Sequence, residues 1–240
     1  MDNLVRSVSN ALGIKPERVT RLLKTRTLRL MKYRGFQYVV IRRDMGDLYE
    51  GTLLITKDGW QSYRFIPGYP HIKRVLLLRK AVTTHFIDRV IVEEKMDGHN
   101  VRVVKENNEI LAITRGGYIC PYTTARLRKL YGNDIVNMLE TLEPQGMLAG
   151  EVVGLENPYT KHYYPEAPDW GFFIFDVWTN GQLLPIAERR RIVEEYGLQN
   201  VPQLGEIEKN DVETLYDIID KLSERKREGL VLKDPYNRVD

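Results

Sequence analysis

The tetrapeptide Lys95-Met96-Asp97-Gly98 lies between two segments of strand-forming residues, 90–92 and 101–105. It therefore occupies the end of one expected strand and the approach to the next. The lysine is a candidate nucleophile, and the glycine lets the backbone turn close to a bulky ligand such as a phosphate. Because four residues with one free position recur by chance, the meaning of this stretch depends on the motifs that follow it.

The lysine needs help to act as a nucleophile at neutral pH. An ordinary lysine has a pKa of about 10.4, so its neutral form lies roughly 4–5 kcal/mol above the charged form at pH 7. On a strand, Glu93, Lys95 and Asp97 would point to the same side. Two carboxylates alone favour the charged ammonium, unless they hold a divalent cation that cancels their charge. The local sequence therefore predicts Mg²⁺; the alternative is a surface lysine in a strand of mixed charge.

Four further motifs follow in order along the chain. They are Arg115-Gly116-Gly117, Gly150-Glu151-Val152-Val153-Gly154, Phe173-Ile174-Phe175-Asp176, and Glu228-Gly229-Leu230-Val231-Leu232-Lys233. An arginine offers a bidentate fork for phosphate, and a carboxylate among apolar residues needs a partner or a ligand. Singly these motifs have plainer interpretations, since Arg-Gly-Gly is usually a turn and a strand phenylalanine is usually core. Their occurrence together in this order is more specific than any one of them alone.

The hydrophobic pattern predicts an α+β fold with antiparallel sheets. Helices are expected at residues 3–12, 16–33 and 185–196, and from Asn210 onward, the last with a capping box completed by Glu213. Strands are expected at residues 36–43, 48–56, 90–95, 101–105, 110–114, 147–153, 171–178 and 229–233. Asn107-Asn108 and Asn180-Gly181 predict turns between strands. Strands and helices do not alternate steadily, so a parallel sheet is not expected.

Charge divides the chain into two parts. Residues 1–90 carry 18 Lys and Arg against 7 Asp and Glu, whereas residues 91–240 carry 18 against 26. Residues 1–90 therefore have a net charge of +11 and residues 91–240 a net charge of −8, for a total of +3. We expect a small basic α/β module at residues 1–88, built from helices and a β-hairpin, ahead of a larger domain at 89–240. The basic module is a candidate surface for binding nucleic acid, and the alternative is a solvated helix face.

Composition and the first residues bear on where in the cell the protein is expected. No run of apolar residues is long enough to span a membrane, and the first residues do not have the pattern of a signal peptide. The single Cys120 can form neither an internal disulfide nor a zinc cluster. These features favour a cytoplasmic protein with no membrane partner.

The ordered motifs resemble those of the ATP-dependent polynucleotide ligases, and most closely the archaeal RNA ligases, over residues 85–240. The resemblance implies a nucleotidyltransferase (ligase adenylation) domain that uses ATP and Mg²⁺ or Mn²⁺. Its expected activity joins RNA 5′-phosphate and 3′-hydroxyl ends through lysyl-AMP and RNA-adenylate intermediates.

The resemblance also implies roles for individual residues. Lys95 and Asp97 would be catalytic. The ATP-binding residues would be Glu94, Lys95, Asn100, Arg115, Glu151, Phe175 and Lys233, with Glu151 on a ribose hydroxyl and Phe175 on adenine. Asp97, Glu151 and Glu228 would hold the metal. For RNA binding, the basic module offers Arg21, Lys24 and Arg29.

The chain also departs from the family pattern. The family places a lysine-containing motif, and archaeal members a dimerising C-terminal domain, after the last motif found here, but this sequence ends at Asp240. We therefore expect a fragment of a longer protein, with weak or stalled ligase activity. The alternatives are a DNA ligase or an RNA-capping nucleotidyltransferase, which share the tetrapeptide, and a non-catalytic RNA-binding relative.

Overall fold

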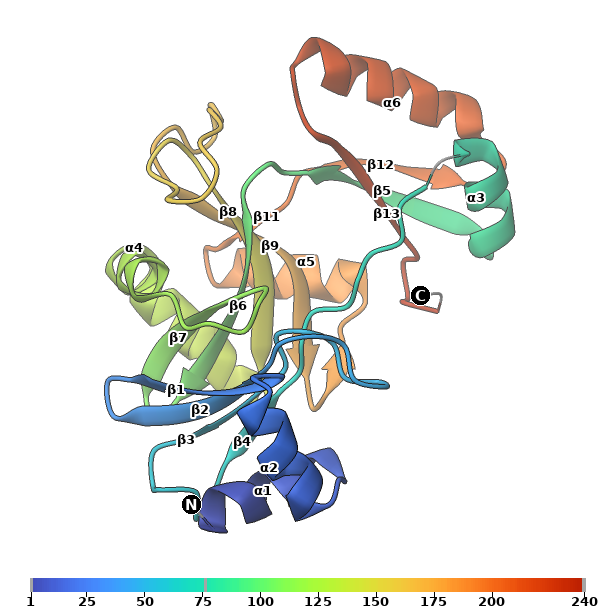
Figure 1. Ribbon diagram of the computed structural model, residues 1–240. Helices are drawn as coiled ribbons and strands as arrows, with labels where there is room; N and C mark the ends of the chain where they lie inside the picture. The colour runs from blue at the N-terminus through green and yellow to red at the C-terminus, as the bar shows by residue number, and fades with distance from the viewer. Residues whose placement is uncertain (1, 76, 239–240) are drawn as a thin grey trace. The chain divides into compact units, whose positions relative to one another are not determined.

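A computed structural model describes residues 2–75 and 77–238 of the chain. The contacts within the chain divide it into two compact units (Figure 1). Unit 1 comprises Met1–Ile72 and Ile113–Pro121, and unit 2 comprises Lys73–Ala112 and Tyr122–Asp240. These packing units do not test the domain boundary that charge predicts at residue 88.

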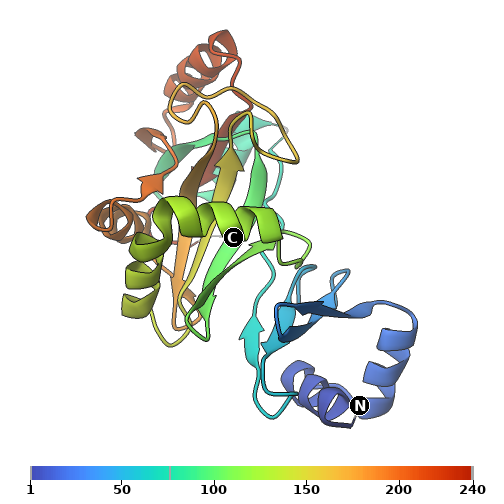
Figure 2. The ribbon, with the colours of Figure 1, turned by 90° about the vertical axis from the view of Figure 1, so that its left-hand side faces the viewer.

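Unit 1 is a four-stranded antiparallel sheet with two helices packed against it (Figure 2). The strands run in the order β1 (Leu28–Tyr33), β2 (Phe36–Ile41), β3 (Leu53–Thr56) and β4 (Arg64–Ile66). The helices are α1 (Asp2–Leu12) and α2 (Pro16–Lys24). Val8 and Val19 from the helices pack with Leu28, Val39 and Leu54 from the sheet, so burial of apolar side chains joins the two layers.

The second predicted helix is wrong beyond Lys24. Arg26 adopts a left-handed φ of 59° and ends the helical segment, and the next residues form β1. This strand pairs with β2 in register from Leu28 opposite Ile41 onward. Gly35 does not stop a helix but forms, with Arg34, a hairpin turn in which both φ values are positive. The predicted strand at 48–56 is also shorter, because only its last four residues pair.

Unit 2 contains two sheets. The larger has the strand order β10-β9-β8-β6-β7, with β11 beside β9. The strand bounds are β6 His99–Glu106, β7 Glu109–Thr114, β8 Met147–Val153, β9 Gly171–Thr179, β10 Gln182–Leu183 and β11 Gln199–Asn200. Helices α4 (Pro121–Thr141) and α5 (Ile186–Glu195) contribute Leu127 and Val193 to the same core. Helix α4 was not predicted, whereas the helix at 185–196 and both asparagine turns are confirmed.

The smaller sheet places β5 at its centre, in the order β12-β5-β13. The strands are β5 (Arg89–Lys95), β12 (Gln203–Glu208) and β13 (Gly229–Lys233), all antiparallel. Helices α3 (Leu78–His85) and α6 (Val212–Glu224) share its apolar cluster (Figure 1). The predicted cap of α6 is wrong by one residue, because Asp211 and not Asn210 accepts the Thr214 amide.

These elements confirm the predicted α+β class with antiparallel sheets. Pairing is antiparallel throughout the strand pairs above, apart from β11 with β9. Within the part of the chain that the structure describes, no helix is long and apolar enough to cross a membrane.

Candidate active site

Lys95 ends the central strand of the smaller sheet and is accessible there. Gly229 on β13 lies opposite it, which brings Glu228 alongside. The Lys95 Nζ and the Glu228 carboxylate form an ion pair, and the lysine side chain is 50% exposed. The strand therefore fixes the backbone of the lysine while leaving its amine open to a ligand from solvent. Sequence order alone could not bring these two residues together, since they lie 133 positions apart.

The rest of the tetrapeptide is held by the loop between β8 and β9. The Asp97 amide donates to the Tyr164 hydroxyl at 2.6 Å, and His162 Nδ1 lies 3.5 Å from an Asp97 carboxylate oxygen. A Cβ at Gly98 would lie 2.1 Å from the Val152 carbonyl oxygen, so only glycine fits. The glycine is thus required by the neighbouring strand β8, a reason different from the predicted turn beside a phosphate.

Asn100 and Glu151 form a polar pair next to this segment. They lie directly opposite each other on β6 and β8, and Glu151 lies opposite Phe173 on β9. Residues opposed in this way share one face of a sheet. Asn100 Oδ1 is buried and has no hydrogen-bond partner among the described residues. A buried acceptor of this kind suits a ligand hydroxyl.

Phe175 stands at an irregularity of β9. Ala149 lies opposite Asp176 and Gly150 opposite Ile174, so Phe175 is the extra residue of a β-bulge. Its ring is half-buried and packs with the cluster that contains Met96 and Phe173. The bulge therefore brings an aromatic side chain next to the tetrapeptide. Of the two phenylalanines considered from sequence, Phe173 is almost fully buried, so the more accessible Phe175 remains our prediction for the adenine contact.

A buried network of four charged groups lies behind the site. Glu93 is bound by Arg189, and both side chains are 1% exposed. Lys233 Nζ lies 3.1 Å from Glu93 and 2.8 Å from Asp176, and it donates to the Phe175 carbonyl at 2.6 Å. Burial alone would raise the pKa of Glu93, but Lys233 and Arg189 together hold it below the ordinary value.

This network corrects the predicted role of Glu93. The strand pattern suggested that Glu93 and Asp97 flank a divalent cation, but Glu93 is already compensated by two cationic side chains. Because β5 ends at Lys95, the alternation of side chains does not extend to Asp97. In this structure the Lys233 ammonium contacts Glu93, Asp176 and the Phe175 carbonyl. Its contact with a phosphate therefore stays a prediction.

Glu94 faces the opposite side of β5 and is also buried. Arg227 lies 3.4 Å from its carboxylate, contacts Glu166 and covers the Tyr164 ring at 4.4 Å. Burial raises the pKa of Glu94 in spite of the nearby Arg227. The Arg227 side chain is 9% exposed, whereas the preceding Arg225 and Lys226 are exposed. The predicted contact of Glu94 with ATP is not tested by this arrangement.

Arg189, Arg227, Tyr164 and His162 were missed by the sequence analysis. For Arg189 a signal existed: it lies three residues after Ile186 and four before Val193, on the buried face of α5. For Arg227 and the two loop residues the sequence offers no periodic pattern, because they lie outside the helices and strands. Only the three-dimensional structure brings Tyr164 and His162 to Asp97, and Arg227 to Glu94.

Arg115 belongs to unit 1, where it lies in the turn after β7. Its guanidinium donates to His71 Nδ1 at 2.8 Å, and His71 Nε2 lies 3.4 Å from Asp44. Since arginine cannot accept a hydrogen bond, His71 Nδ1 must be the acceptor. Gly117 has a φ of 83°, and a Cβ there would lie 2.7 Å from Val40, so the turn requires this glycine. The Arg-Gly-Gly motif is therefore a tight turn that presents an oriented arginine.

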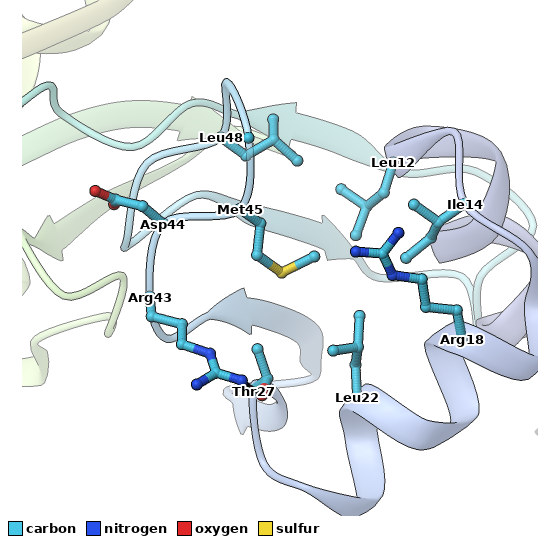
Figure 3. Close-up of a pocket in the computed structure, with 10 residues that line it drawn as sticks. Leu12, Ile14, Arg18, Leu22, Thr27, Arg43, Asp44, Met45 and Leu48 are labelled. Atoms are coloured by element: carbon cyan, nitrogen blue, oxygen red, sulfur yellow. Dashed lines mark hydrogen bonds between the residues drawn. The ribbon is translucent and has the colours of Figure 1, made fainter.

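The basic residues proposed for RNA lie on the surface of unit 1. Arg21 and Lys24 are exposed on α2, and exposed Arg29 on β1 lies 3.5 Å from the Tyr118 hydroxyl. Beside them is a cavity of about 420 Å³ that Arg18 and Arg43 border from opposite sides (Figure 3). Its lining is otherwise largely apolar, including Leu12, Leu22 and Met45. The Arg18 side chain forms no hydrogen bond or ion pair with the described part of the chain.

No preformed metal cluster accompanies the predicted ligands. Within residues 2–75 and 77–238, no three side chains of His, Cys, Asp or Glu gather closely enough to hold a metal ion. Mg²⁺ commonly binds one or two carboxylates together with substrate phosphates and water. The exposed oxygens of Asp97 and Glu228 at the end of β5 fit that mode of binding.

The mixed fold with antiparallel sheets around this site matches the nucleotidyltransferase fold of solved ATP-dependent RNA ligases. The chain belongs to the RNA ligase family, whose sequence model matches residues 88–240. An archaeal ATP-dependent RNA ligase is 35% identical with a TM-score of 0.89, over 98% of this chain and 62% of that chain.

Two further relatives extend the comparison. An uncharacterized protein from Methanocaldococcus jannaschii is 34% identical over 95% of this chain and 58% of its own length. A protein from Aquifex aeolicus, named as a candidate ATP-dependent DNA ligase, is 32% identical with a TM-score of 0.82, over 94% of this chain and 61% of that chain. The chain thus spans about three fifths of the length of these relatives.

Proposed function

We propose that this chain carries out the nucleotidyl transfers of an ATP-dependent RNA ligase. The observation that carries the proposal is Lys95, an accessible amine fixed at a strand end in contact with Glu228, in a chain of the RNA ligase family. The substrates proposed are ATP and RNA with 5′-phosphate and 3′-hydroxyl ends. We place the reaction in the cytoplasm, where the free Cys120 stays reduced.

The reaction consists of three displacements at phosphorus. The neutral Lys95 amine attacks the α-phosphorus of ATP and forms a P–N bond, the bond to the β-phosphate breaks, pyrophosphate leaves, and the nitrogen loses a proton. An oxygen of the RNA 5′-phosphate then attacks the same phosphorus, the P–N bond breaks, and the lysine takes up a proton. Finally a 3′-hydroxyl attacks the RNA 5′-phosphorus, loses its proton and expels AMP.

The nucleoside would lie against the larger sheet of unit 2. Asn100 Oδ1 is the buried acceptor that a ribose hydroxyl would satisfy, and Glu151 lies opposite it. Phe175 offers an aromatic face, and adenine stacks on such faces. The position of the bulge sets that ring beside Met96, the second residue of the tetrapeptide. Arg115, Glu94 and Lys233 complete the proposed set of ATP-binding residues.

Asp97 and Glu228, with Glu151, are the proposed oxygen ligands for Mg²⁺ or Mn²⁺. When bound, the ion would neutralise charge on the reacting phosphates. In this structure the Glu228 carboxylate pairs with the Lys95 ammonium.

Labelling experiments test this proposal. With α-labelled ATP and Mg²⁺ we expect a covalent protein adduct, and with α-labelled GTP we expect none. Adenylate transfer should then occur to 5′-phosphorylated RNA more efficiently than to nicked DNA. Preference for nicked DNA would favour the DNA ligase function suggested by the Aquifex aeolicus relative, and an adduct from GTP would favour a capping-type enzyme. Absence of any adduct would favour a non-catalytic RNA-binding protein.

The basic surface of unit 1 should contribute to RNA affinity. Replacing Arg21, Lys24 and Arg29 by serine should weaken binding of single-stranded RNA. Each lost phosphate contact should reduce the dependence of log affinity on log salt by about 0.7. Fluorescence anisotropy across a salt series measures both quantities, and serine replacements of Lys57 and Arg79 serve as controls, since Lys57 covers the Phe36 ring and Arg79 pairs with Glu213. An unchanged slope in the triple variant would mean that these side chains are merely solvated.

A further inference from the structure

The loop between β8 and β9, residues 154–170, is anchored firmly in unit 2. The side chains of Asn157 and Tyr164 are fully buried, and Trp170 at its end is 7% exposed. Asn157 Nδ2 donates to the Val152 carbonyl at 2.8 Å, and the Tyr159 amide donates to Asn157 Oδ1 at 3.0 Å. The loop nevertheless stands out from the end of the sheet (Figure 1, yellow). It is therefore a projecting segment whose shape is fixed by internal anchors.

This loop presents two tyrosine rings and a cation to solvent. Tyr159 is 62% exposed and Tyr163 is 58% exposed. Lys161, between them in sequence, is exposed and forms no hydrogen bond or ion pair with residues that the structure describes. Tyrosine is enriched at binding surfaces because it combines an apolar ring with a hydroxyl that can hydrogen-bond. Aromatic rings for bases, combined with a cation for phosphate, are the elements with which proteins bind single-stranded nucleic acid.

The same anchors connect the loop to the catalytic tetrapeptide. Tyr164 accepts the Asp97 amide hydrogen. Asn157 Oδ1 contacts His99 Nδ1 at 2.8 Å, and the Tyr159 and His99 rings are 4.7 Å apart. The Tyr159 ring is therefore in contact with His99, directly after the tetrapeptide, and Tyr163 precedes Tyr164, which binds the Asp97 amide. A nucleic acid bound along the loop would have its end beside the reactive lysine.

We propose that Tyr159, Lys161 and Tyr163 bind the terminal nucleotides of the 5′-phosphorylated RNA strand. This inference rests on the proposed function, because it names the strand that receives AMP from Lys95. The 5′-phosphate strand must reach the lysyl-AMP before the 3′-hydroxyl strand takes part. A surface attached to the Lys95–Gly98 segment itself is suited to that first encounter. The tyrosine rings stack on bases, and the Lys161 ammonium pairs with a backbone phosphate.

The test uses Tyr159→Ala and Tyr163→Ala with a 5′-phosphorylated RNA strand blocked at its 3′ end. Each variant should bind this strand about 5- to 20-fold more weakly in fluorescence anisotropy. The rate of adenylate transfer to the strand at subsaturating RNA should fall by a similar factor beyond any change in lysyl-AMP formation. Tyr159→Phe and Tyr163→Phe keep the rings and should recover wild-type behaviour. Lys161→Ser should lower the salt dependence of binding.

Tyr216→Ala is the matched control, because Tyr216 is a 44% exposed tyrosine on α6 of the same unit. Unchanged affinity and transfer in both alanine variants would overturn the proposal. So would an equal loss in Tyr216→Ala, or failure of the phenylalanine variants to restore binding, which would indicate a structural role for the hydroxyls. Loss confined to sealing, with adenylate transfer intact, would assign the loop to the 3′-hydroxyl strand and also refute it. Absence of lysyl-AMP in the wild type would refute the ligase function, while the binding measurements would still test the loop.

Discussion

Replacing Lys95 by alanine should reduce the covalent AMP adduct to below detection. The adduct needs a nitrogen nucleophile at the end of β5, and alanine supplies none. The wild type, incubated with ATP and Mg²⁺, should gain one AMP that is labile in acid, as a phosphoramidate is. Intact-mass analysis measures the adduct, and peptide mapping should place it on Lys95. Persistence of the same adduct in Lys95→Ala would contradict the assignment.

Lys95→Arg separates the chemistry of the lysine from its structural role. Arginine can keep the ion pair with Glu228 but stays protonated, so it cannot attack ATP. We therefore expect Lys95→Arg to fold like the wild type and to form no adduct. Lys226→Ala removes an exposed lysine near the end of α6 and should leave adduct formation unchanged. Adduct formation by Lys95→Arg would mean that Lys95 serves the fold and that another residue is the nucleophile.

The sequence predicted the strands around the tetrapeptide because their signals are local. Apolar runs on β5 and β8, and paired asparagines at Asn107-Asn108, each determine the backbone over a few residues. The same kind of reasoning failed after Lys24, where Leu30 and Met31 have helical spacing but lie on a strand. Pairing of β1 with β2 and the left-handed Arg26 decide that segment, and neither is visible in a hydrophobic pattern.

For the candidate site, the motifs suggest which residues belong together, but not how these residues contact one another. Motif order predicts roles for Lys95, Glu151 and Glu228, but the contact of Lys95 with Glu228 depends on the register of β13 against β5. The accessibility of Phe175 depends on a bulge, which has no sequence signal of its own. Glu93 was misjudged for a related reason. Its partners Arg189 and Lys233 come from elements far away in sequence.

The second large expected effect is on the stability of unit 2, and it comes from the buried partner of Glu93, Arg189. Arg189→Met should lower the free energy of unfolding of unit 2 by about 3–5 kcal/mol. The substitution leaves the buried Glu93 carboxylate with Lys233 alone and removes a donor from the Phe175 carbonyl. Chemical denaturation followed by circular dichroism measures the loss. Arg191→Met is the matched control, because Arg191 forms an exposed pair with Glu195 on the same helix and should change stability by about 0.3–0.5 kcal/mol.

The double variant Glu93→Gln with Arg189→Met should be more stable than the sum of the two single changes predicts. The four buried groups form two balanced pairs, Glu93 with Arg189 and Lys233 with Asp176. Removing one whole pair leaves the other neutral overall, whereas removing one member leaves a buried charge uncompensated. If Arg189→Met costs no more than Arg191→Met, the buried pair contributes little to the fold. If the double variant is simply additive, Glu93 and Arg189 do not act as a pair.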